Sequence, residues 1–294
     1  MAITVLVTGA DGFLGRNLVL YLASRNFKVI AASRTASDFK HPGVSSAPLP
    51  DLARPFDWQA LLEKCDAVVH LAGIAHRFAD ENQYNLVNHR ATEALANAAS
   101  RLGKHLVFVS SIAAQSGSFS EVELTEDDPP KPTNSYGRSK LAAEQSVRAA
   151  RGSFTILRPV VIYGQGEKGN FSFIHKISGM LIPLPFGALT AQRSVLSVEN
   201  FSSAVVLVLT EPRARREMFI VSNPTPLTVP GLISRQRATL LRSPWLVPIP
   251  ENWIQLLLAA AGATGLWQRI GKPLIARPTK LLALGWEPSE RGHL

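Results

Sequence analysis

Tyr136 and Lys140 could together carry proton-transfer chemistry, because they lie four residues apart in a stretch that we expect to be helical. That spacing places both side chains on one face of the helix, within reach of one ligand. A phenol with a pKa of about 10 is a poor base at neutral pH, but a neighbouring ammonium stabilises its phenolate. Such a tyrosine can exchange a proton with an alcohol or a ketone.

Two serines, Ser110 and Ser111, follow the apolar residues 105–109, which we expect to form a strand. In open parallel sheets, ligands bind at the carboxyl ends of the strands, and these serines stand at that edge. We interpret Ser111 as the side chain that hydrogen-bonds the same substrate oxygen as Tyr136, with Ser110 as the alternative.

Three glycines spaced three apart, Gly9, Gly12 and Gly15, follow the apolar residues 3–8. The pattern predicts a buried strand, a tight turn and the start of a helix. Gly9 permits the turn, Gly12 lets a diphosphate approach the backbone, and Gly15 lets the helix pack closely on the strand. The N–H groups that would face this anion belong to Asp11, Phe13 and Leu14. The stretch predicts a dinucleotide site, with a strand–turn–helix that binds nothing as the alternative.

The residues that follow the second expected strand, Ser33 and Arg34, bear on which dinucleotide binds. An acidic side chain here would bind the 2′-hydroxyl of the adenosine ribose, whereas Arg34 can pair with a 2′-phosphate. We therefore favour NADP over NAD, with a solvated Arg34 as the alternative. Asp51 and Leu52, after the third expected strand, are predicted to lie beside the adenine.

Further cofactor contacts are expected where residues 67–71, a fourth strand, end in small residues that let a ligand pass close to the backbone. Asn88 lies in an expected helix at residues 81–102, where it either holds the geometry of the site or is a core amide satisfied by its surroundings. The cofactor contacts expected from these segments and from the end of strand 105–109 are Leu71, Ala72, Gly73, Asn88 and Val109.

The succession of strand and helix patterns predicts an α/β fold with a Rossmann-type, doubly wound parallel sheet. We assign residues 1–170 to this dinucleotide-binding domain, with returning segments near 195–222. Residues 171–294 are rich in proline and should mostly form a smaller, substrate-binding lobe of short helices and irregular connections.

The sequence also predicts how one helix begins and whether another lies in a membrane. The helix that carries Tyr136 should begin with Asn134 or Ser135 as its N-cap. Residues 253–267 are apolar but fall short of the roughly 20 residues that a bilayer span needs. We interpret them as a packed helix, with a membrane-surface anchor as the weaker alternative.

Composition limits the classes of partner. The single cysteine, Cys65, excludes an internal disulfide framework, and the seven histidines show no metal-ligand spacing. No signal-peptide pattern is visible, so a reducing, cytoplasmic location is expected. The net charge of +9 fits anionic partners, and the scattered basic residues favour small phosphate ligands. Neither nucleic acid nor a membrane is expected as a partner.

The chain resembles the extended short-chain dehydrogenases/reductases, and within them the group of nucleotide-sugar epimerases, dehydratases and reductases. The resemblance covers most of the chain and rests on residues 8–15, 70–73, 109–111, 136–140 and 157–159, with Asn88 and Thr92. It implies that Tyr136 is the acid/base, that Lys140 binds the nicotinamide ribose and supports Tyr136, and that Ser111 assists.

The same resemblance implies further contacts. Residues 158–160 resemble the segment that passes the nicotinamide, so Pro159 and Val161 are expected at the cofactor. Asn170 and Arg193 fall where the family often contacts the diphosphate of the substrate, with a solvated Arg193 as the alternative. A nucleotide-diphosphate sugar is therefore the expected partner, and a homodimer is left open.

The residues after the strand-end serines narrow the reaction. The family's 4,6-dehydratases carry an acidic pair there, whereas this chain has Ile112 and Ala113. Arg34 resembles the pattern of the NADP-using reductases, which favours 4-keto reduction of the sugar, with an NAD-dependent 4-epimerase as the alternative. A non-catalytic NADP-binding sensor or scaffold is a third hypothesis, which the complete set of Ser111, Tyr136 and Lys140 disfavours.

Overall fold

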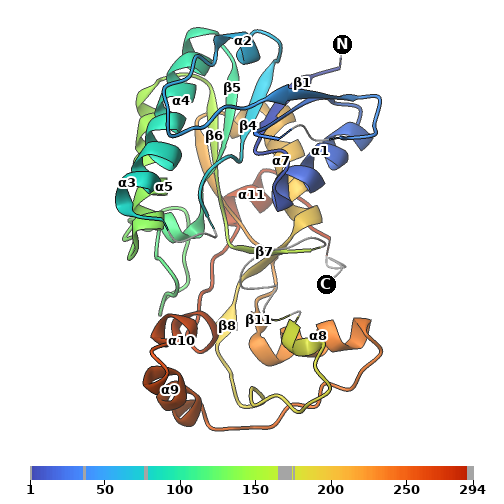
Figure 1. Ribbon diagram of the computed structural model, residues 1–294, viewed down its shortest axis with the longest axis vertical. Coiled ribbons are helices and arrows are strands. Elements are labelled where there is room, and N and C mark those ends of the chain that lie inside the picture. Colours follow the sequence, from blue (N-terminus) through green and yellow to red (C-terminus); the bar gives the residue numbers. More distant parts are fainter. Residues whose placement is uncertain (1, 36–37, 76–78, 165–173, 175, 290–294) are drawn as a thin grey trace.

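The computed structural model describes residues 2–35, 38–75, 79–164, 174 and 176–289 of the chain. Its centre is a sheet of seven strands: β1 (Thr4–Thr8), β2 (Lys28–Ser33), β3 (Val44–Pro48), β4 (Ala67–His70), β5 (His105–Val109), β6 (Phe154–Pro159) and β10 (Glu217–Val221). They lie in the order β10-β6-β5-β4-β1-β2-β3, and every pair is parallel (Figure 1). The predicted doubly wound α/β fold is confirmed.

Helices cover both faces of this sheet, because its central strands are apolar on both sides. One face carries α1 (Phe13–Ser24) and α7 (Val198–Thr210); the other carries α2 (Gln59–Leu62), α4 (Ala91–Arg101) and α5 (Ser135–Ala149) (Figure 1). In β1, Val5 and Val7 pack into the first core and Leu6 into the second. The alternation follows from the two-residue period of a strand.

The helices expected at residues 81–102 and after Asn134 are present, with local differences. Residues 81–102 form α3 (Glu81–Tyr84), a π-helical turn η1 (Asn85–Arg90) and then α4. At the start of α5, the Asn134 side chain accepts a hydrogen bond of 2.7 Å from the Gly137 N–H, so Asn134 is the N-cap rather than Ser135.

The glycine-rich turn after β1 requires glycine at two positions. Gly9 has a φ of +72°, in the left-handed region that other residues rarely adopt. A Cβ added to Gly15 would lie 2.1 Å from the Gly9 carbonyl oxygen and 2.7 Å from the Ala10 Cα. The start of α1 therefore packs directly on the turn, as the spacing predicts.

A second group of elements lies at the other end of the long axis (Figure 1). It contains β8 (Gln192–Arg193), β11 (Leu227–Thr228), α8 (Val229–Thr239), α9 (Glu251–Ala260) and α10 (Thr264–Ile270). The paired strands β7 (Val161–Tyr163) and β9 (Val195–Ser197) lie between this group and the sheet, where both contact α7. The chain then returns to the sheet, where α11 (Thr279–Ala283) contacts β10. A separate apolar cluster forms the core of the second group, including Leu184, Ile233, Ile254 and Trp267. We call this group the distal lobe; the residue limits of the domains stay a prediction.

The prediction of one packed helix over residues 253–267 is wrong. The segment is divided between α9 and α10, and α9 buries only Ile254. The other large apolar side chains of α9 are too many for one helix face, so the small core of the distal lobe does not bury them all. Within the described ranges, no helix has both the length and the apolar character needed to cross a bilayer.

We expect Gly15→Ala to lower the free energy of unfolding by about 1–3 kcal/mol, because the new methyl group overlaps backbone atoms that cannot rotate away. Gly265→Ala in α10 is the matched control, since its methyl group meets nothing within 4 Å and alanine favours helices. Urea unfolding followed by circular dichroism measures both. A Gly15→Ala protein as stable as the parent would contradict this account of the turn.

Candidate active site

A cleft of about 420 Å³ lies at the carboxyl ends of the central strands, where the strand order reverses between β1 and β4. This is where ligands bind in open parallel sheets. The predicted site residues that line it are Phe13, Leu14, Leu71, Gly73, Val109, Ser111, Tyr136, Lys140, Pro159, Val161 and Arg193. Residues from across the sequence thus meet at one edge of the sheet.

The start of α1 suits a diphosphate. Gly12 is the N-cap and makes no side-chain cap, so no side chain covers the first N–H groups of the helix. Phe13 and Leu14 line the cleft at this point. A Cβ on Gly9 would lie 2.9 Å from the Ala72 nitrogen, so the turn and the end of β4 leave room for backbone alone. These residues fit a dinucleotide held at the helix N-terminus.

Some predicted cofactor residues lie beside the cleft rather than in its wall. Arg34 is exposed just beyond β2, and the buried Ser33 donates a 2.6 Å hydrogen bond to the Thr35 carbonyl. Asp51 is exposed and accepts from the Ala53 N–H, whereas the Leu52 side chain packs in the core. The structure therefore supports no adenine contact through the Leu52 side chain. Asn170 lies outside the described residues.

Tyr136 and Lys140 point from the first turns of α5 into the cleft. The Lys140 ammonium donates a 2.9 Å hydrogen bond to the Val109 carbonyl and lies 5.0 Å from the centre of the Phe108 ring. Burial lowers the pKa of Lys140 to about 8, and the Glu144 carboxylate acts in the opposite direction. Burial raises the pKa of Tyr136 to about 12, against the effect of its hydrogen bond with Ser111.

Burial opposes the expected effect of Lys140 on the acidity of Tyr136, and the supporting role of Lys140 stays a prediction. Desolvation of the phenolate is the largest influence on the pKa of Tyr136, and the ammonium is not among its causes. Tyr136 therefore keeps its proton at neutral pH. A neutral phenol that can donate its proton suits an acceptor such as a ketone oxygen.

The structure also separates the two serines. Ser111 is the N-cap of η2 (Ile112–Ala114), and its hydroxyl is hydrogen-bonded to Tyr136. Ser110 instead donates a 2.5 Å hydrogen bond to the buried Glu144 carboxylate. The geometry favours Ser111 as the residue at the reacting oxygen, with Ser110 as part of the support beneath it.

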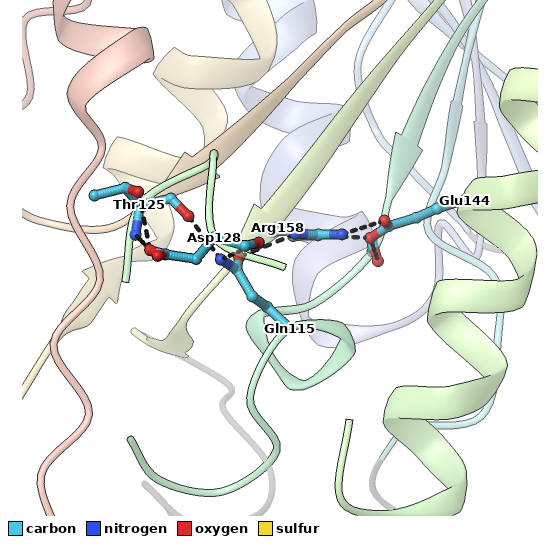
Figure 2. Close-up of polar contacts among 6 residues, drawn as sticks. Gln115, Thr125, Asp128, Glu144 and Arg158 are labelled. Carbon is cyan, nitrogen blue, oxygen red and sulfur yellow. Dashed lines mark hydrogen bonds and ion pairs between the residues drawn. The ribbon is translucent and has the colours of Figure 1, made fainter. Parts of the chain in front are cut away.

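A buried ion pair connects α5 to β6 beneath the cleft (Figure 2). Arg158 donates from Nε and Nη2 to the two Glu144 carboxylate oxygens, at 2.9 and 2.6 Å. Its Nη1 donates to Gln115, which in turn donates to the carbonyls of Thr125 and Asp128. Both charged side chains are almost fully buried. The network fixes the helix of Tyr136 and Lys140 against the end of β6 and against the loop before α5.

Asn88 has its hydrogen-bonding groups occupied by the protein. Its carbonyl accepts from the Ile74 N–H at 2.7 Å, and its amide donates to the Ile74 carbonyl and to the Ser139 hydroxyl. These contacts hold the loop after β4 against α5. The π-helical turn η1 brings Asn88 to this point. These contacts fit both interpretations of Asn88, since the amide is satisfied by its surroundings and also holds two segments of the site together; its contact with the cofactor stays a prediction.

Arg193 is buried rather than solvated. Its guanidinium donates to the carbonyls of Ser118, Gln268 and Lys272, so it ties β8 to the end of α10. Burial lowers the pKa of Arg193 to about 10, and the nearby Arg269 acts in the same direction. Both arginines line the cleft, and together they suit an anionic group.

Several cleft residues were not predicted from the sequence. These are Ile74, Ala75, Tyr84, Ala113, Gly117, Ser118, Asn134, Ile162, Arg269 and Leu274. Tyr84 is the clearest case, because its ring lies 6.1 Å from that of Tyr136, yet no motif surrounds it. Arg269 is an isolated arginine in α10, and only the packing of the distal lobe brings it to the cleft.

Comparison with known proteins places these features in context. A family model described as the NAD dependent epimerase/dehydratase family matches residues 5–221. The chain is 29% identical over 300 residues to a UDP-glucose 4-epimerase of Vibrio cholerae, covering 98% of this chain and 91% of that protein. It is 32% identical over 209 residues to a GDP-6-deoxy-D-talose 4-dehydrogenase of Aggregatibacter actinomycetemcomitans, covering 67% and 66%.

The fold is shared with solved structures. The structure of MoeE5 in complex with UDP-glucuronic acid and NAD superposes with a TM-score of 0.77 at 22% identity, covering 99% of this chain and 96% of that one. At this level of identity, the likeness establishes the arrangement of the elements.

We expect Glu144→Gln to lower the free energy of unfolding by about 3–5 kcal/mol, because Arg158 is left buried without a counter-charge. Glu93→Gln is the matched control, since its 2.9 Å pair with Arg90 is largely exposed and should contribute less than about 1 kcal/mol. Chemical denaturation of both variants tests the difference. Equal effects would mean that the buried network does not hold α5.

Proposed function

Because the chain belongs to the NAD dependent epimerase/dehydratase family, we propose that it reduces the 4-keto group of a nucleotide-linked sugar with NADPH. Family membership confirms the interpretation of the chain as an NAD(P)-dependent enzyme of the extended short-chain dehydrogenase/reductase type. The two relatives named above are a 4-epimerase and a 4-dehydrogenase of nucleotide sugars, which supports chemistry at C4.

The arrangement that supports the proposal is Tyr136 hydrogen-bonded to Ser111 in the cleft, with Lys140 held by the Val109 carbonyl in the same cleft. Reduction of a ketone needs a proton donor at the oxygen, and burial holds the pKa of Tyr136 at about 12. None of the described residues that line the cleft carries a carboxylate, which leaves the dehydratase chemistry without an acidic pair. Ile112 and Ala113 occupy the positions after Ser111, and Ala113 reaches the cleft wall.

Each residue then has a role at the reacting carbon. The hydride for C4 would come from a nicotinamide cofactor held in the cleft. Tyr136 donates its proton to the ketone oxygen, and Ser111 hydrogen-bonds that oxygen. Lys140 is positioned by the Val109 carbonyl to bind the ribose of the cofactor and to support Tyr136. Arg193 and Arg269 would face the diphosphate of the substrate.

Stoichiometry separates reduction from the alternatives. We would incubate the protein with NADPH or NADH and either a 4-keto or a 4-hydroxy nucleotide sugar, and follow both cofactor and sugar. A reductase consumes one reduced cofactor for each 4-keto sugar. An epimerase interconverts 4-hydroxy sugars without net loss of cofactor, and that result would replace our proposal with the epimerase. Cofactor binding without turnover of any sugar would favour a sensor or scaffold.

We expect Tyr136→Phe to lower kcat by roughly 10²- to 10⁴-fold, because the ring and its packing remain while the proton donor is lost. Affinity for the cofactor should change little, since the aromatic ring and its packing are kept. Single-turnover kinetics with a 4-keto nucleotide sugar tests this. Tyr21→Phe, which removes a surface hydroxyl that pairs with Arg25, is the control and should keep the parent rate. A Tyr136→Phe enzyme that reduces substrate at the parent rate would mean that another group is the acid.

We expect Arg34→Ala to remove a preference for NADPH over NADH. A charge-assisted contact with the 2′-phosphate contributes about 1.5–3 kcal/mol, or roughly 10- to 150-fold in affinity. Calorimetric titration of both cofactors into the parent and the variant measures it. Arg101→Ala at the exposed end of α4 is the control. Equal affinities in the parent protein would overturn the assignment of NADP.

A further inference from the structure

The end of the distal lobe that is farthest from the sheet displays an unusual amount of apolar surface. Ten of the fourteen large apolar side chains exposed in the described part of the chain lie here: Met180, Leu181, Ile182, Leu240, Leu241, Trp245, Val247, Trp253, Leu256 and Leu257. Leu241 is 96% exposed and Trp253 is 62% exposed. We call these ten residues the apolar end. They lie on three segments of the distal lobe, residues 180–182, 240–247 and 253–257, whereas the other four exposed side chains are scattered over the rest of the described chain.

The apolar end is a fixed part of the fold. Buried Arg237 donates hydrogen bonds to the carbonyls of Ser178, Met180, Ile182 and Pro244, and so clamps the two loops that carry most of the exposed residues. The Leu184 N–H also donates to the Trp245 carbonyl, which joins the loops directly. The third segment, α9, is anchored by buried Ile254.

The backbone is held in an unfavourable conformation where it displays two of these side chains. Leu241 has a φ of +55° and Trp245 a φ of +41°, in the left-handed region that bulky residues avoid. Both residues are nevertheless exposed, Leu241 at 96% and Trp245 at 56%. Local strain of this kind persists where the surrounding structure over-determines it, and it is often connected with function.

The segments that carry the apolar end contain more basic than acidic side chains. The described residues 176–192 and 229–272 contain one acidic side chain, Glu251. That carboxylate accepts hydrogen bonds from the N–H and the hydroxyl of Thr190. The same ranges contain six basic side chains. Arg237 is buried, Arg269 lines the cleft and Lys272 pairs with Glu121 at 3.2 Å. The exposed cations that remain are Lys176, Arg235 and Arg242. Arg242 lies between Leu241 and Trp245 in sequence, so a cation stands within the apolar end itself.

This charge selects among possible occupants. A second copy of the chain, packed about a two-fold axis, would bring the same basic residues against one another, and such like-charge contact disfavours association. Anionic lipid headgroups complement the charge, and the acyl boundary beneath them accepts the leucines. Tryptophan suits the layer between the two, because its ring is apolar and its N–H is polar.

We propose that the apolar end docks on the surface of an anionic lipid bilayer. Leu241, Trp245 and Leu257 enter the headgroup boundary, and Arg235 and Arg242 lie at the phosphates. The proposal goes beyond the reaction proposed above and does not depend on it. The sequence led us to expect no membrane as a partner, because we interpreted residues 253–267 as a packed helix. The proposal replaces that expectation.

Vesicle flotation of the full chain tests the proposal. We expect the protein to float with vesicles of phosphatidylcholine and phosphatidylglycerol, to bind pure phosphatidylcholine more weakly, and to lose binding as salt is added. Trp245 and Trp253 are exposed, whereas Trp58, Trp267 and Trp286 are buried. A blue shift of tryptophan emission on binding therefore reports on the apolar end. A parent protein that binds neither kind of vesicle would overturn the proposal.

Two substitutions locate the binding surface. Leu241→Asn introduces a residue that tolerates the left-handed backbone at this position. Leu257→Gln introduces a good helix former, so α9 should stay intact. We expect each to weaken vesicle binding roughly tenfold, with an unchanged circular dichroism spectrum. The matched control is Leu20→Gln, an exposed leucine on α1 far from the apolar end, which should bind as the parent does.

Two outcomes would contradict the assignment of this surface. If both variants bind vesicles as tightly as the parent, the apolar end is not the docking surface. If sedimentation equilibrium without vesicles shows a dimer that Leu241→Asn dissociates, a second copy of the chain covers the surface instead. A monomeric parent protein that floats with anionic vesicles supports the proposal.

Discussion

The buried ion pair between Glu144 and Arg158 is the contact on which the arrangement of the site depends (Figure 2). It lies where α5 crosses the end of β6, four residues beyond Lys140, and it is extended by Ser110 and Gln115. A buried pair of this kind contributes little net stability compared with apolar packing, but an incomplete pair is very costly. The arrangement therefore penalises displacement of α5, and the side chains of Tyr136 and Lys140 keep their places relative to the strand ends.

Burial away from water also determines the protonation of Tyr136 and Lys140. Burial disfavours the charged form of each, so the pKa of Tyr136 rises and that of Lys140 falls. The hydrogen bond with Ser111 and the charge of Glu144 oppose these shifts without reversing them. The outcome is a protonated phenol beside a lysine held by the Val109 carbonyl, an arrangement suited to delivering a proton to an oxygen.

The sheet and the distal lobe differ in where their apolar side chains lie. At the sheet, apolar side chains are covered on both faces by helices, and polar groups gather at the strand ends. In the distal lobe, the core is small, and Arg237 uses its buried guanidinium to fix loops whose apolar side chains face outward. The cleft lies between these regions and takes Arg193 and Arg269 from the distal lobe. A ligand bound there would contact both the sheet domain and the distal lobe.

The sequence by itself determined the elements whose patterns are local. The apolar strands, the three glycines and the spacing of Tyr136 and Lys140 each express a short-range steric or periodic requirement, so the sheet and most of the cleft could be predicted. Only the tertiary structure decided which serine meets Tyr136, because Ser110 and Ser111 differ in what packs beneath them, not in their local pattern. It likewise placed Tyr84 and Arg269 at the cleft and left α9 exposed. Those outcomes depend on contacts between distant segments and on the burial they create, and burial also decided that the pKa of Tyr136 is raised rather than lowered.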